Sequence, residues 1–76
     1  MQSATPPWIR QARIELGNRI RDARLQADLT QEKLAEIAGV ERRSVQNAEA
    51  GSVDVKFSMI MRLAKALRLP AGDLMP

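Results

Sequence analysis

The side chains best suited to bind another molecule lie close together, between residues 41 and 51. Two adjacent arginines, Arg42 and Arg43, are followed by Gln46 and Asn47. An arginine can donate two hydrogen bonds to the O6 and N7 atoms of guanine, and an asparagine can pair in a similar way with N6 and N7 of adenine. This set of polar groups is typical of a surface that reads the edges of DNA bases.

Two short helices joined by a turn would position these side chains. Thr30 is a favourable N-cap for the first of them, since its side chain can accept a hydrogen bond from a free backbone N–H. Gly39 would end this helix, because glycine adopts a positive φ without a Cβ clash. Between these two residues the apolar positions recur with a helical period: Leu34, Ala35, Ile37 and Ala38.

The second helix would begin after Glu41 and end near Gly51. Val45 and Ala48 are three residues apart and would form its buried face, while the arginines and amides cover the other side. Val40 would turn inward and plug the turn before it. The stretch 30–51 therefore predicts a helix, a turn and a second helix with one polar face left free.

Two further helices are predicted around this unit. A first helix from Trp8 has one apolar stripe, which Ile14 and Leu25 widen: Trp8, Ala12, Leu16, Ile20 and Ala23. A fourth helix has an inner face formed by Phe57, Ile60, Met61, Ala64 and Leu67. Leu63 lies beside this face. We expect Phe57 or Met61 to fill the space beside the small Ala48.

The two ends of the chain are less regular. Residues 1–7 form a polar, proline-ended lead that we expect to be mobile, with Pro7 in the first helical turn. Leu69 and Pro70 stop the fourth helix. Residues 71–75 then predict one short final helix, whose Leu74 and Met75 pack back onto the domain or contact a second subunit.

Composition excludes several classes of protein. The 76 residues can form one small domain, and they contain no cysteine, histidine or tyrosine. The common thiolate and imidazole metal ligands and the usual general base are therefore missing, so we expect no metal, no cofactor and no enzyme activity. No apolar run is long enough to span a membrane, and we expect a cytoplasmic protein. The net charge of +3 is compatible with a nucleic-acid partner.

Over most of its length the chain resembles the Cro and phage-repressor type of helix-turn-helix protein, the XRE family. The resemblance covers residues 16–75 and is carried by these residues: Ile20, Arg21, Arg24, Thr30, Gln31, Leu34, Ala35, Gly39, Val40, Ser44, Val45, Glu49, Gly51 and 63–67. It implies an all-α fold, a five-helix lambda-repressor-like domain over residues 8–76 with an extended first helix. The combined spacing is far more specific than one glycine between two helices.

The resemblance also implies roles for individual residues. Arg42, Arg43 and Asn47 match the family's base-contacting positions, and Gln46 can assist them. The resemblance implies a phosphate contact from the side chain or the backbone N–H of Gln31, and Ser44 is either a phosphate contact or a packing residue. Two lysines are candidates by their own charge: Lys33 replaces the acidic or amide residue of the family's capping box and adds a cation near DNA, and Lys56 is the only basic residue in a loop where the family often has a basic residue and a proline. Arg24 and Glu49 stand where family members have a partly buried salt bridge.

The chain departs from the family pattern at some positions. Glu41 occupies a cap position where serine or threonine is common, and it must turn away from phosphate, pair with Arg42 or Arg43, or accept a hydrogen bond from cytosine. Asp28 stands where glycine is frequent. The extension before Leu16 has three interpretations. It can pack on the hydrophobic end of the domain, form a dimer contact, or act as an arm that reaches DNA. The helical spacing of Trp8 favours packing.

We therefore expect a homodimer that binds double-stranded DNA sequence-specifically on a two-fold related operator and regulates transcription. Repression by occluding a promoter is our expectation, and activation through contact with polymerase is its alternative. Two other functions fit the same fold. One is an antitoxin or a restriction-system control protein that also holds a protein partner, and the other is a protein-interaction module that no longer binds DNA.

Overall fold

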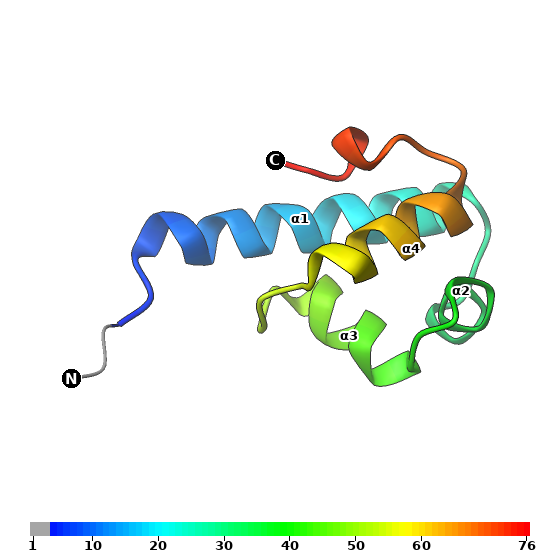
Figure 1. The fold of residues 1–76 in the computed structure, drawn as a ribbon, viewed down its shortest axis with the longest axis horizontal. Helices are drawn as coiled ribbons and strands as arrows, with labels where there is room; N and C mark the ends of the chain where they lie inside the picture. Colours follow the sequence, from blue (N-terminus) through cyan, green and yellow to red (C-terminus); the bar gives the residue numbers. More distant parts are fainter. Residues whose placement is uncertain (1–3) are drawn as a thin grey trace.

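The computed structural model describes residues 4–76 and contains four α-helices (Figure 1). They are α1 (Pro7–Gln26), α2 (Gln31–Ala38), α3 (Arg42–Ala50) and α4 (Phe57–Leu67). The fifth predicted helix is only a 3-10 turn, Ala71–Asp73. The fold class is therefore all-α as predicted, with four α-helices in this part of the chain instead of five.

The long α1 runs along the molecule, α3 and α4 pack against it, and α2 packs against α3 and α4 (Figure 1). Helix α3 contacts both α1 and α2, while α4 packs against α2 and α1. The C-terminal segment folds back after α4, and its Leu74 is only 1% exposed. Leu74 thus packs onto the domain, which was one of the two predicted outcomes.

One hydrophobic core holds the helices together. Its members with less than 2% exposure come from all four α-helices and the C-terminal segment: Ile20, Leu34, Val45, Ala48, Leu63 and Leu74. Burying a leucine, isoleucine or valine side chain contributes about 1.5–3 kcal/mol relative to leaving it in water. This core fixes α3 by its Val45 and Ala48 side and so leaves the opposite side of the helix exposed.

Close packing of α1 on α3 depends on Gly17. A Cβ atom added at this position would lie 2.5 Å from the carbonyl oxygen of Ala48 and 2.6 Å from that of Glu49. The backbones of the two helices therefore approach closely where α1 carries no side chain. This approach closes the space beside the small Ala48, whereas the predicted filling by Phe57 or Met61 is wrong, because these side chains are 76% and 45% exposed.

Several other apolar residues that the helical pattern assigned to the core are exposed. Trp8 is 72% exposed, so the prediction that it packs on the end of the domain is wrong. Three further members of the predicted apolar faces are also at least 44% exposed: Ile14, Leu25 and Ile37. The periodic pattern identifies one side of each helix, but the neighbouring helices cover only the middle of that side.

The predicted lead, residues 1–7, is only partly described. Residues 1–3 lie outside the described residues, and Pro7 is the first residue of α1, preceded by Pro6 as its N-cap residue. A proline is well suited to this position, since the first N–H groups of a helix have no partner within it.

Candidate nucleic-acid interface

Helices α2 and α3 form the predicted helix-turn-helix unit. The Thr30 hydroxyl accepts a hydrogen bond of 3.0 Å from the backbone N–H of Lys33, which caps α2 as predicted. Gly39 ends α2 with a φ of 71°, and Gly51 ends α3 with a φ of 69°. Both predicted stops are therefore confirmed, and the left-handed conformation at Gly39 turns the chain from one helix into the other.

A hydrogen-bonded ion pair fixes α3 to α1. The guanidinium of Arg24 donates to both carboxylate oxygens of Glu49, from Nε at 2.7 Å and from Nη2 at 3.0 Å. A further bond of 2.8 Å runs from Nη1 to the carbonyl oxygen of Leu29. The two side chains are 11% and 4% exposed, and the hydrogen bond to Glu49 raises the pKa of Arg24 above its already high value. The structure thus contains the predicted Arg24–Glu49 salt bridge.

The same carboxylate also holds Gln31 at the start of α2. The Gln31 side-chain amide donates to Oε1 of Glu49 at 3.1 Å, a contact that the sequence did not reveal. Glu49 therefore ties together α1, α2 and α3, and its negative charge is turned inward. The backbone N–H of Gln31 heads α2, where the first N–H groups carry a partial positive charge and have no partner within the helix.

The four predicted base-contacting residues share the free side of α3. Arg42, Arg43 and Gln46 are exposed, and Asn47 is half-buried. At the helical period their side chains span an arc of about 140°, and the buried Ala48 lies on the opposite side with Val45 next to it. These four residues are thus brought together on one face, with no other part of residues 4–76 covering three of them.

Few contacts within the protein compete for these side chains. Arg42 lies 3.9 Å from the Glu32 carboxylate, and both side chains are well exposed, so this pair contributes about 0–1 kcal/mol. Within residues 4–76 no side-chain hydrogen bond or ion pair involves Arg43 or Gln46. Glu41, the N-cap residue of α3, is exposed and does not pair with either arginine as one interpretation required.

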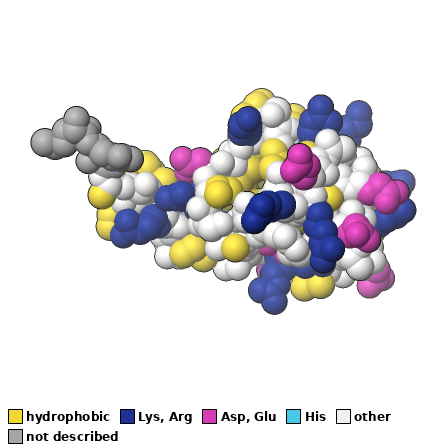
Figure 2. Space-filling model, turned by 90° about the horizontal axis from the view of Figure 1, so that it is seen from below, with side chains coloured by type: hydrophobic (Ala, Val, Ile, Leu, Met, Phe, Trp, Pro, Cys, Tyr) yellow, Lys and Arg dark blue, Asp and Glu magenta, His cyan; other side chains and the backbone are white. Residues whose placement is uncertain are grey.

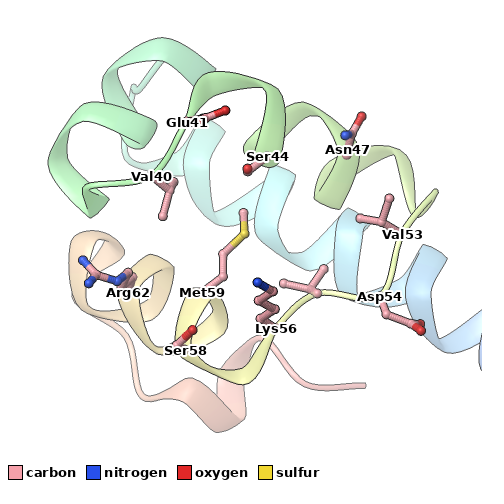
Figure 3. Close-up of a pocket in the computed structure, with 11 residues that line it drawn as sticks. Val40, Glu41, Ser44, Asn47, Val53, Asp54, Lys56, Ser58, Met59 and Arg62 are labelled. Carbon is pink, nitrogen blue, oxygen red and sulfur yellow. The ribbon is translucent and has the colours of Figure 1, made fainter.

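An open groove separates α3 from the start of α4 (Figure 3). Ser44 and Asn47 line it from α3, and Lys56 lines it from the residue before α4. Its volume is about 430 Å³. Ser44 and Lys56, two of the predicted phosphate-contacting residues, therefore lie on the two sides of one groove beside the exposed face of α3.

The charges near this face are mixed. Lys33, the remaining predicted phosphate contact, is exposed and forms an ion pair of 3.2 Å with Glu36 on the same helix. Figure 2 shows Lys and Arg side chains spread across the side of the molecule on which α3 lies, with Asp and Glu side chains among them. Because Glu49 is 4% exposed and bonded to Arg24, one of the four acidic residues of the stretch 30–51 does not contribute free negative charge to this side.

The two arginines of the N-terminal extension are engaged by the protein itself. Arg10 donates a hydrogen bond of 2.7 Å to the carbonyl oxygen of Thr5, and Arg13, only 18% exposed, lies 3.6 Å from the carboxylate of Asp54. These contacts give no support to the interpretation of the extension as a DNA-reaching arm.

Among residues 4–76, no cluster of three or more metal-ligating side chains was found. In the same range no helix is both long and apolar enough to cross a membrane.

These observations define a DNA-binding domain of the helix-turn-helix class. A helix-turn-helix family model matches residues 20–74, so the chain belongs to this family, the XRE type, and is a DNA-binding transcription regulator. No curated protein sequence matches the chain significantly.

Solved structures of regulators have the same fold. The restriction-modification controller protein C.AhdI from Aeromonas hydrophila is 33% identical, with a TM-score of 0.81, over 83% of this chain and 96% of that one. The hypothetical transcription factor NHTF from Neisseria is 28% identical, with a TM-score of 0.83, over 100% of this chain and 87% of that one. The clp gene regulator ClgR from Corynebacterium glutamicum is 25% identical, with a TM-score of 0.79, over 83% of this chain and 67% of that one.

Proposed function

We propose that this protein acts as a homodimer in the cytoplasm, binds a two-fold related operator in double-stranded DNA, and represses transcription by occluding a promoter. The observation that carries the proposal is the exposed face of α3, on which two guanidinium groups and two carboxamides lie together. In a helix-turn-helix dimer the two recognition helices lie about 34 Å apart, one turn of DNA. Each copy would then insert α3 into the major groove of one half-site.

The base contacts follow from the donors and acceptors of these side chains. Arg42 and Arg43 are suited to guanine, where each can donate to O6 and N7, and Asn47 is suited to adenine. Each such pair discriminates between bases by about 1–3 kcal/mol. Gln46 extends the same face by one more carboxamide.

Four residues around this face are proposed to contact phosphates. The head of α2 at Gln31 offers free backbone N–H groups, and Ser44 and Lys56 border the groove beside α3. Lys33 can reach a phosphate after it leaves Glu36, because an exposed pair of this kind is weak. Contacts with phosphates supply affinity without sequence preference and make the binding dependent on salt.

Replacing Arg42 tests the assignment of α3. Arg42→Ala should weaken binding to the selected operator by about 1–3 kcal/mol and relax the preference at one base position of each half-site. Lys65→Ala is a matched control, since it also removes one exposed positive charge but lies on α4, outside the proposed contacts. A binding-site profile that Arg42→Ala leaves unchanged would rule out the assignment.

A more specific role as a controller of a restriction-modification system is the second candidate. It is favoured by the 33% identity to C.AhdI over 96% of that controller. Selection of genomic fragments bound by the protein separates the two candidates. A controller should select fragments next to restriction and modification genes, whereas a general repressor should select other promoters.

A further inference from the structure

A group of large apolar side chains is exposed around the N-terminal half of α1. Trp8 near the start of α1 is 72% exposed, Phe57 and Met61 on α4 are 76% and 45% exposed, and Met75 near the C-terminus is 46% exposed. We call these four residues the terminal apolar surface. Single exposed apolar residues are ordinary on proteins, but a group of this size commonly marks a binding surface.

A shallow groove connects the elements that carry these residues. It is lined mostly by apolar side chains from the start of α1, from α4 and from the C-terminus: Trp8, Ile9, Ala12, Leu16, Val55, Ile60 and Met75. Phe57 and Met61 lie about 60° and 100° from Ile60 on the same flank of α4. Met59 is on the other flank and lines the groove beside α3 (Figure 3). Trp8 and Met75 thus share one groove with Ile60, and Phe57 and Met61 flank Ile60 on the side away from the groove beside α3. The two grooves meet at Asp54 and Val55, which line both.

The fold of a single copy does not account for the apolar residues of the extension. No residue from Pro7 to Glu15 is buried, although these residues form more than two turns of α1. The family match begins only at residue 20. The extension thus adds an exposed tryptophan to the domain without enlarging its core.

The size of this surface fits one side of a small protein interface. A buried aromatic side chain removes about 150–250 Å² from water, so Trp8 and Phe57 at their present exposures offer roughly 220–370 Å². A stable interface buries about 800 Å² on each partner. The two aromatic residues alone supply roughly 30–45% of that area, and the exposed methionines add to it.

The charges at its edge are compatible with a second copy. Arg13 and Asp54 form an ion pair beside the groove, so its rim carries one positive and one negative charge. In an isologous dimer the same patch is present on both sides, and because these two charges already neutralise each other within one copy, they do not repel the same pair on the other copy. None of the four apolar residues lies on α2 or α3, so such a dimer leaves both recognition helices free.

We infer that a second copy of this chain covers the terminal apolar surface in an isologous dimer, with Trp8 as its main anchor. The choice of partner rests on the proposed function, because a two-fold related operator requires two copies. The interface itself is measurable without DNA.

Analytical ultracentrifugation of the full chain over a range of concentrations tests the inference. Wild-type protein should dimerise, and Trp8→Ala should weaken dimerisation by about 100-fold, since truncating an interface anchor costs about tenfold or more and the change occurs twice in the dimer. Phe57→Ala should act in the same direction. Leu25→Ala is the control, because Leu25 is 53% exposed but lies near the other end of α1. Circular dichroism should show that all three variants fold.

Two results would overturn the inference. One is a wild-type chain that stays monomeric, and the other is a dimer that Trp8→Ala and Phe57→Ala weaken no more than Leu25→Ala does. Binding to a single half-site keeps the proposed function separate. Trp8→Ala should leave half-site affinity unchanged, whereas a loss there would identify the extension as a DNA contact and also overturn the inference.

Discussion

Removing the Glu49 carboxylate should destabilise the domain strongly, because this group ties α1, α2 and α3 together. It accepts two hydrogen bonds from Arg24, at 2.7 and 3.0 Å, and one from Gln31, at 3.1 Å. After Glu49→Ala the guanidinium keeps only its bond to the Leu29 carbonyl oxygen while its side chain remains 11% exposed. Stranding one member of a buried pair costs about 3–5 kcal/mol, and the retained bond favours the lower end, about 3 kcal/mol.

For a domain of this size, a loss of about 3 kcal/mol lowers Tm by about 12–24 °C. Urea unfolding followed by circular dichroism measures the free energy of unfolding directly. Glu36→Ala is the control, since it breaks the Lys33–Glu36 pair, whose side chains are 55% and 69% exposed. It should change stability by no more than about 0.5 kcal/mol.

A double variant separates the stranded charge from the loss of packing. Arg24→Met combined with Glu49→Leu removes both charges and fills the site with apolar atoms, a change that is often close to neutral for buried pairs. The double variant should therefore be more stable than Glu49→Ala alone. The reasoning fails if Glu49→Ala costs no more than Glu36→Ala.

Three other changes test separate parts of the structure. Gln31→Ala should weaken binding to all DNA sequences similarly, by about 1 kcal/mol or fivefold, because it removes the side-chain amide, whose second N–H can donate to a phosphate while the first donates to Glu49. A fluorescence titration that shows a changed base preference would argue against a phosphate contact. Gly17→Ala should destabilise the domain by about 1–3 kcal/mol, because the new Cβ meets backbone oxygens of α3 at 2.5 and 2.6 Å. A higher free energy of unfolding in this variant would contradict the close approach of α1 to α3 at Gly17. Arg68→Gly should stabilise it by about 0.5–1 kcal/mol, since Arg68 has a φ of 59° that glycine adopts without strain, and a loss of stability in the same assay would be evidence against that strain.

The elements with local chemical signals could be predicted from the sequence. Thr30 caps α2 and Gly39 ends it, because a side-chain acceptor and a missing Cβ act within a few residues of the chain. The Arg24–Glu49 pair lies 25 residues apart and was predicted only through the resemblance to a family. The positions of Arg42 and Asn47 on a free face followed from the helical spacing of Val45 and Ala48, which form the buried face of α3.

The sequence could not predict which apolar residues stay outside the core. Trp8, Phe57 and Met61 have the correct helical spacing, but spacing defines a side of a helix and not how much of that side the neighbouring helices cover. The final segment is similar, since Ala71–Asp73 is too short for more than one 3-10 turn. Gly17 carried a signal, a glycine inside a predicted helix, whose reason is visible only once α3 is placed against it.

Selection of genomic DNA fragments by the wild-type protein and by Arg43→Ala tests the central claim most directly. Arg43 is exposed on α3 and forms no ion pair within residues 4–76. The wild type should enrich a two-fold related motif with half-site centres about 34 Å apart, and Arg43→Ala should lose the preference at one position of each half-site. Fragments without a common motif, or a motif that Arg43→Ala leaves intact, would contradict the assignment of α3 as the element that reads DNA.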